Sequence, residues 1–113
     1  MKSEALKDLV VAALEDLKAV NIRVLNVSSM TGVTDFMIVA GGTSSRHVRS
    51  LVDAVAVSAK QHGVTPLGIE GEQHAQWGLV DLGDVVVHVM LPEARDFYQL
   101  EKLWSFDAQE KRI

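Results

Sequence analysis

Two stretches of the chain carry apolar residues at the spacing of an amphipathic α-helix. In residues 6–17 the apolar positions recur every three or four residues, with Ser3 before them as a candidate N-cap and Asn21 after them as a candidate stop. The same spacing returns in residues 48–59, and Gly63 follows as a helix terminator. We therefore predict one helix near the N-terminus and a second in the middle of the chain.

Shorter apolar segments predict the strands of a sheet. Residues 23–27 and 66–70 read as strands, and residues 35–41, "DFMIVAG", have no polar alternation. Such a continuous run predicts a mid-sheet strand that is buried on both faces. Residues 77–90 predict a hairpin that turns near Gly83 and whose second arm is also central.

A last helix is predicted after the hairpin. Pro92 suits its first turn, and one of its faces carries Phe97, Leu100 and Trp104. The predicted order is helix, two strands, helix, three strands and helix. This order indicates an α/β fold with a mixed five-stranded sheet flanked by helices.

Length and composition indicate one globular domain. The chain has 113 residues, of which 48% are hydrophobic and 23% charged. We expect one domain over residues 1–104 and a frayed tail over residues 105–113. No apolar run approaches the roughly 20 residues that a membrane span needs, and the absence of cysteine excludes disulfides and thiol chemistry. A cytoplasmic protein is expected, without membrane contact.

The charge of the chain is negative and uneven. The net charge of −4 argues against a large nucleic-acid surface, so little direct contact with nucleic acid is expected. Seven acidic residues and one base, Arg95, lie between Ile69 and Glu101. This segment is either ordinary solvated surface or a face for a basic protein.

The segment "GGTSS", residues 41–45, follows a strand and opens a helix, as phosphate-binding loops do. It lacks the longer glycine patterns of nucleotide sites. We favour an architectural loop in which the glycines allow the turn and Thr43 or Ser44 caps the helix. The small basic cluster that follows comprises Arg46, His47 and Arg49.

A nucleotide-binding or nucleotidyltransferase-like enzyme that uses this loop is the alternative function. Such an enzyme needs two carboxylates at alternate positions of a nearby strand, where they hold metal ions. Asp53 stands alone on a predicted helix, and Asp81 and Asp84 straddle the predicted turn. The required pair is missing, so no enzymatic activity is predicted.

Two further polar features are expected to be structural. Glu70, Glu72 and His74 alternate in "EGEQH" and could face one metal ion, but a flexible loop is the favoured interpretation. His88 lies in an apolar strand, where a hydrogen-bonded core histidine is expected. We predict no catalytic set, no metal site and no cofactor.

Aromatic residues near the acidic segment are candidates for a protein interface. Trp77 begins a predicted strand, and Tyr98 lies next to Phe97, about 100° away from it on a helix. Tryptophan and tyrosine at such positions are typical interface anchors. Packing in the core is an equally good interpretation for Trp77 and Trp104.

Four motifs occur in order along the chain, namely "TDFMIVAGGTSSRHV", "GIEG", "WGLVDLGDVVVHVM" and "RDFYQLEKLW". Together they resemble the ribosomal silencing factor family, which is related to the plant Iojap protein. The resemblance runs from about Leu6 to Trp104. It implies a nucleotidyltransferase-like fold without transferase activity, in agreement with the missing catalytic carboxylates.

The resemblance also implies a function as a translational repressor. Members of this family are expected to bind the large ribosomal subunit at ribosomal protein fourteen and to block joining of the small subunit. They can form homodimers. The positions that match the family's partner surface are Trp77, Asp81, Leu82, Tyr98 and Leu100, with Glu101 and Leu103 nearby.

Overall fold

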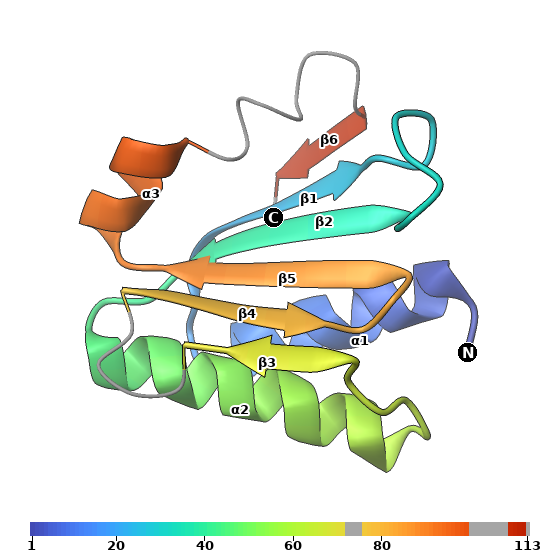
Figure 1. The fold of residues 1–113 in the computed structure, drawn as a ribbon. Helices are drawn as coiled ribbons and strands as arrows, with labels where there is room; N and C mark the ends of the chain where they lie inside the picture. The colour runs from blue at the N-terminus through green and yellow to red at the C-terminus, as the bar shows by residue number, and fades with distance from the viewer. Residues whose placement is uncertain (72–75, 100–108, 113) are drawn as a thin grey trace.

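The computed structural model describes residues 1–71, 76–99 and 109–112, and it shows one mixed sheet with helices packed against it (Figure 1). The strand order in the sheet is β3-β4-β5-β2-β1-β6. The elements are α1 (Ser3–Asp16), β1 (Val20–Asn26), β2 (Phe36–Gly41), α2 (Ser45–Gln61), β3 (Gly68–Glu70), β4 (Trp77–Asp81), β5 (Val85–Met90), α3 (Pro92–Tyr98) and β6 (Gln109–Arg112).

Strand β2 lies in the middle of the sheet. It pairs in parallel with β5 and antiparallel with β1, and the remaining neighbours are all antiparallel. All six residues of β2 are buried, which confirms the prediction from its continuous apolar run. The predicted hairpin is also confirmed, since β4 and β5 are joined by a turn in which Gly83 has a φ of 86°.

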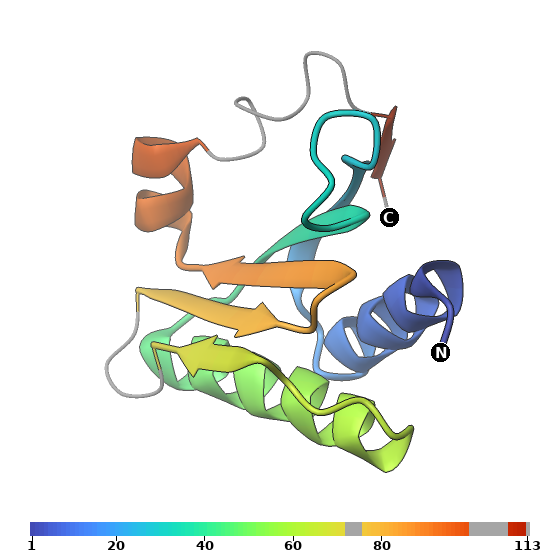
Figure 2. The same cartoon turned by 45° about the vertical axis from the view of Figure 1, so that its right-hand side comes forward.

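The two faces of the sheet are covered unequally. Helices α1 and α2 lie on one face (Figure 2), where they form the larger core with apolar residues of β1, β2, β4 and β5. A smaller buried cluster occupies the other face near α3, and Trp77 packs against it. This cluster contains Leu25, Val27, Met37, Val39, Met90 and Ala94.

The sheet has one strand more than the five expected. The five predicted strands are all present, and β6 pairs antiparallel with β1 from Asn26↔Gln109 to Arg23↔Arg112. The expectation of a frayed tail was therefore wrong for residues 109–112. The sequence "QEKR" has no strand pattern. It forms a strand because the free edge of β1 has backbone N–H and C=O groups that need hydrogen-bond partners, and this edge exists only in the folded sheet.

Both long helices end in the same hydrogen-bonded motif. After α2, Gly63 has a φ of 81°, and the N–H groups of Gly63 and Val64 donate to the carbonyls of Lys60 and Ala59. This confirms Gly63 as a terminator.

The first helix departs from its predicted boundaries. It ends at Asp16 because Lys18 takes the left-handed conformation, with a φ of 60°, that a glycine would usually supply. Asn21, the expected stop, instead lies in β1 where the pairing with β2 is irregular, and its φ is 50°. The N-cap is Lys2 rather than Ser3, since the Lys2 carbonyl already accepts from the Leu6 N–H.

The last helix is shorter than predicted. It begins at Pro92 as expected but ends at Tyr98, because Gln99 is left-handed with a φ of 50°. Leu100 and Trp104, which were assigned to the same helix face, lie outside the described residues. No helix in the described part of the chain is long and apolar enough to cross a membrane.

The left-handed conformations of Lys18 and Gly63 predict that introducing glycine at the end of the first helix is stabilising and that removing it at the end of the second is destabilising. A side chain in this conformation costs about 1 kcal/mol, so Lys18→Gly is expected to stabilise the protein by up to about that amount. Gly63→Ala is expected to destabilise it by about 1 kcal/mol. Urea denaturation measures both, with Lys18→Ala as a control that keeps the strain. Equal stability of the wild type, Lys18→Gly and Gly63→Ala would contradict this assignment of the helix ends.

Candidate functional site

The loop between β2 and α2 is shaped by close packing and by a helix cap. A Cβ on Gly41 would lie 2.7 Å from Cγ2 of Val20, and a Cβ on Gly42 would lie 2.7 Å from Cγ2 of Val48. The Ser44 Oγ accepts from the backbone N–H of His47 at 3.1 Å and so caps α2. The prediction that Ser44 or its neighbour caps the helix is confirmed.

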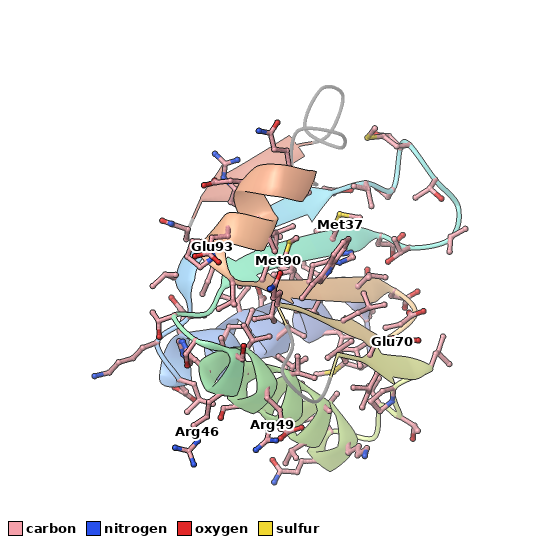
Figure 3. The ribbon with its side chains drawn as sticks, turned by 60° about the vertical axis from the view of Figure 1, so that its left-hand side comes forward. Met37, Arg46, Arg49, Glu70, Met90 and Glu93 are labelled. Carbon is pink, nitrogen blue, oxygen red and sulfur yellow. The ribbon has the colours of Figure 1, made fainter. Side chains whose placement is uncertain are left out.

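His47 links this loop to the end of α1. Its Nδ1 accepts from the Thr43 N–H at 2.9 Å, and its Nε2 donates to the Leu17 carbonyl at 2.7 Å. The imidazole is thus committed to backbone groups on both sides. Of the small basic cluster, only Arg46 and Arg49 point away from the molecule on the surface of α2 (Figure 3).

Removal of the cap gives a stability prediction. Ser44→Ala is expected to lower the free energy of unfolding by about 0.5–2 kcal/mol, because the N–H groups of the first helical turn lose an acceptor. Ser50→Ala, at an exposed position inside the same helix, is the matched control and is expected to be neutral. Chemical denaturation measures both. A Ser44→Ala variant as stable as the control would show that the cap contributes nothing.

The acidic residues considered for catalysis do not form a pair at alternate positions of one strand. Asp53 is exposed on α2, and Asp84 is exposed after the hairpin turn. The Asp81 Oδ1 accepts from the Gly83 N–H at 2.9 Å and fixes that turn. Within residues 1–71, 76–99 and 109–112, no three histidine or acidic side chains lie close enough to hold a metal ion. Glu72 and His74 lie outside the described residues.

The hairpin presents a partly exposed face that points away from α1 and α2. In β4, a Cβ on Gly78 would meet Val52 of α2, so the alternate residues of that strand point to the opposite side. The register pairs Trp77 with Met90, Leu79 with His88 and Asp81 with Val86. Five of these residues have intermediate exposure, and we call them the outer face: Trp77, Leu79, Asp81, Val86 and His88.

Exposed acidic side chains occur on β3 and α3, the elements next to the hairpin strands. Glu70 pairs with Leu79 across β3 and β4 and is exposed. Glu93 is exposed on α3, and Figure 3 shows Glu70 and Glu93 on either side of Met90. The mixture of apolar, aromatic and acidic groups is suited to a protein partner that carries positive charge.

A hydrogen bond joins two residues of the outer face. The Trp77 Nε1 donates to the His88 Nδ1 at 3.0 Å, and the two ring centroids lie 5.7 Å apart with planes tilted by 50°. Because His88 accepts at Nδ1, its neutral form carries its proton on Nε2. The expectation of a hydrogen-bonded core histidine is confirmed for the hydrogen bond but wrong for the position, because His88 lies on the partly exposed outer face and in neither buried cluster.

Burial keeps His88 neutral. Desolvation disfavours the imidazolium and lowers the pKa of His88 from 6.5 to about 4. In the unfolded chain His88 takes up a proton near pH 6.5, whereas in the folded protein it does so only near pH 4. The stability that follows from this difference is complete above pH 6.5 and is lost as the pH falls to about 4.

The shifted pKa predicts a pH dependence of stability. Between pH 7 and pH 4 the free energy of unfolding of the wild type should fall by about 2–3 kcal/mol more than that of His88→Gln, which has no titrating group. Denaturation curves of both proteins at several pH values measure this difference. The contribution of the carboxylates to the pH dependence is the same in both proteins and therefore cancels. Parallel curves for the two proteins would refute the lowered pKa.

Four of the residues predicted to bind a partner lie in the described part of the chain. Trp77 and Asp81 lie on the outer face, both from β4. Leu82 has only 6% exposure and packs in the larger core, so it offers a partner little contact area. Tyr98 is the last residue of α3. Three predicted residues lie outside the described part of the chain, namely Leu100, Glu101 and Leu103.

Leu79, Val86 and His88 were not among the predicted site residues. They share the outer face with Trp77 because the register of β4 against β5 brings alternate residues together. The alternation of β4 and β5 about Gly83 was available in the sequence. It does not tell which of the two faces the helices cover, so it could not select these residues.

The described fold is a small α/β domain with a partly exposed apolar and acidic sheet face. A family model described as "Ribosomal silencing factor during starvation" matches residues 1–113. A ribosomal silencing factor from Chromobacterium violaceum is 46% identical over 105 residues, which cover 93% of this chain and 86% of the relative. A mouse protein named mitochondrial assembly of ribosomal large subunit protein 1 is 37% identical and matches 94% of this chain and 49% of its own length.

Solved structures agree with these matches. A crystal structure of a Chromobacterium violaceum protein, 46% identical, superposes with a TM-score of 0.91 over 93% of this chain and 88% of that one. A Bacillus halodurans structure, 37% identical, has a TM-score of 0.82 and covers 89% of this chain and 94% of its own. The chain belongs to the ribosomal silencing factor family, a ribosome-associated group.

Proposed function

We propose that this protein represses translation by binding the large ribosomal subunit at ribosomal protein fourteen, where it blocks joining of the small subunit. Trp77 and Tyr98 anchor the partner, and Asp81 and Glu101 supply complementary charge. The observation that carries this proposal is the partly exposed Trp77 on an acid-rimmed sheet face in a member of the ribosomal silencing factor family.

The chemistry of the outer face supports a protein partner with basic groups. Tryptophan gives a large contact area for little loss of side-chain entropy, and Leu79 and Val86 extend the apolar surface beside it. Asp81 and Glu70 disfavour direct contact with phosphate. The name of the mouse relative refers to the ribosomal large subunit, which supports that subunit as the target.

The proposed action is steric and involves no catalysis. The fold is proposed to be nucleotidyltransferase-like without the catalytic carboxylate pair. Two observations support this, since Asp53 lies on a helix and the Asp81 Oδ1 accepts from the Gly83 N–H at the hairpin turn. We place the protein in the cytoplasm, with its ribosomal target. The homodimer implied by the family resemblance stays a prediction.

Truncation of the two anchors tests the proposal. Trp77→Ala and Tyr98→Ala should each weaken binding to purified large subunits by more than about tenfold, because central aromatic anchors contribute about 2 kcal/mol or more. Both variants should also let the two subunits associate in a joining assay that the wild type inhibits. Val57→Ala, which truncates a 52% exposed side chain on α2, is the matched control and should behave like the wild type.

Circular dichroism must show that the anchor variants are folded, because Trp77 also packs against the smaller cluster. Raising the salt concentration should slow association of the wild type more than it speeds dissociation, since attraction between an acidic face and a basic protein is screened. Folded variants that bind and block joining as well as the wild type would place the contact surface elsewhere.

A further inference from the structure

The hydrogen bond between Trp77 and His88 spans two neighbouring strands. Trp77 begins β4, and His88 is the fourth residue of β5, diagonal to Trp77 in the register that pairs Leu79 with His88 and Trp77 with Met90. Diagonal neighbours on one sheet face are within reach of aromatic side chains. The 3.0 Å contact is therefore built from the strand pairing itself rather than from a flexible loop.

The donor in this contact has one hydrogen to give. An indole offers a single N–H and no acceptor, so an N–H that donates to His88 is not available to another molecule. A partner that contacts Trp77 therefore meets carbon surface and the π-system of the ring rather than its N–H group. Such a surface attracts aliphatic side chains and the cationic groups of lysine or arginine, and it offers nothing to a hydrogen-bond acceptor.

We propose that His88 is the positioning residue of this binding face: its Nδ1 holds Trp77 in one orientation with the indole N–H turned inward, so that the partner meets a fixed ring. The inference rests on the proposed function and adds to it the chemistry of the contact. The partner presents an apolar cleft or a cation stacked on the ring, and Asp81 on the same face favours the cation.

Positioning contributes to affinity because it is complete before binding. Immobilising a side chain during association costs conformational entropy and so lowers affinity, and the cross-strand hydrogen bond removes part of that cost for Trp77. Histidine performs this task as a neutral group, since an imidazolium has no free lone pair to accept the indole N–H. The burial of His88 maintains that state at neutral pH.

Two substitutions at position 88 separate positioning from packing. His88→Gln keeps an acceptor and should bind purified large subunits within about twofold of the wild type. His88→Leu keeps the volume but removes the acceptor, and it should weaken binding by about three- to tenfold. In a Trp77→Phe background, which has no indole N–H, His88→Leu should change binding by less than about twofold, so the two sites should be coupled.

The indole N–H resonance in a ¹H–¹⁵N spectrum reports on the hydrogen bond itself, and a general loss of stability would not shift it selectively. The Trp77 signal, assigned by its loss in Trp77→Phe, should be shifted downfield and protected from exchange in the wild type and in His88→Gln. In His88→Leu it should move and exchange faster while the backbone signals stay in place. A long-range spectrum of the wild-type imidazole, which needs no variant, should show an unprotonated Nδ1.

The outcomes distinguish this inference from the proposed function. A protonated Nδ1, or equal effects of His88→Leu with and without the indole N–H, overturns the positioning role. Full binding by a folded Trp77→Ala variant overturns the proposed binding site, and with it the assignment of partner chemistry, whatever the spectra show. Weaker binding by His88→Gln than by His88→Leu also contradicts the inference, because the acceptor would then be irrelevant.

Discussion

Strand β2 has no residue that faces solvent, and a strand buried on both sides needs cover on both faces of its sheet. Helices α1 and α2 supply that cover on one face. On the other face the cover is the smaller cluster near α3, to which Met37 and Val39 of β2 belong. The cover does not extend fully over the hairpin, because Leu79, Val86 and His88 remain partly exposed. Both faces of the sheet are thus covered at the central strand, whereas the outer face of the hairpin remains accessible to another protein.

The polar side chains of the outer face already have hydrogen-bond partners within the protein. The indole N–H and the imidazole Nδ1 satisfy one another, and the Asp81 carboxylate is held by the hairpin turn. A partner that covers this face leaves neither the indole nor the imidazole Nδ1 without a hydrogen bond, so desolvating this pair costs less than desolvating unpaired groups. Trp77 thus packs against the smaller cluster and keeps its indole N–H satisfied while its side chain remains partly exposed.

Sequence patterns predicted the features that are set locally. The apolar run of β2, the turn at Gly83, the cap at Ser44 and the terminator at Gly63 each depend on residues close in the chain, and the structure confirms them. The pairing of β6 with β1 depends on distant parts of the fold, and no local pattern indicates it. The left-handed Lys18 was missed for a different reason, since lysine, unlike glycine, does not favour that conformation. The site divides in the same way. Trp77 and Asp81 were indicated by residue type and family resemblance, whereas the partnership of Trp77 with His88 follows from a register that only the folded sheet defines.

Both edge strands of the sheet are short. Strand β3 has three residues and β6 has four, and the sequence of β6 is polar throughout. An edge strand of this length gives an added strand only a few backbone hydrogen bonds. Charged residues along the edge also disfavour the edge-to-edge pairing that leads to aggregation. Extension of the sheet from one molecule into the next is therefore a poor route to self-association. Contacts between side chains on exposed faces are the more favourable way for two copies to associate, since their shape and charge can select the partner.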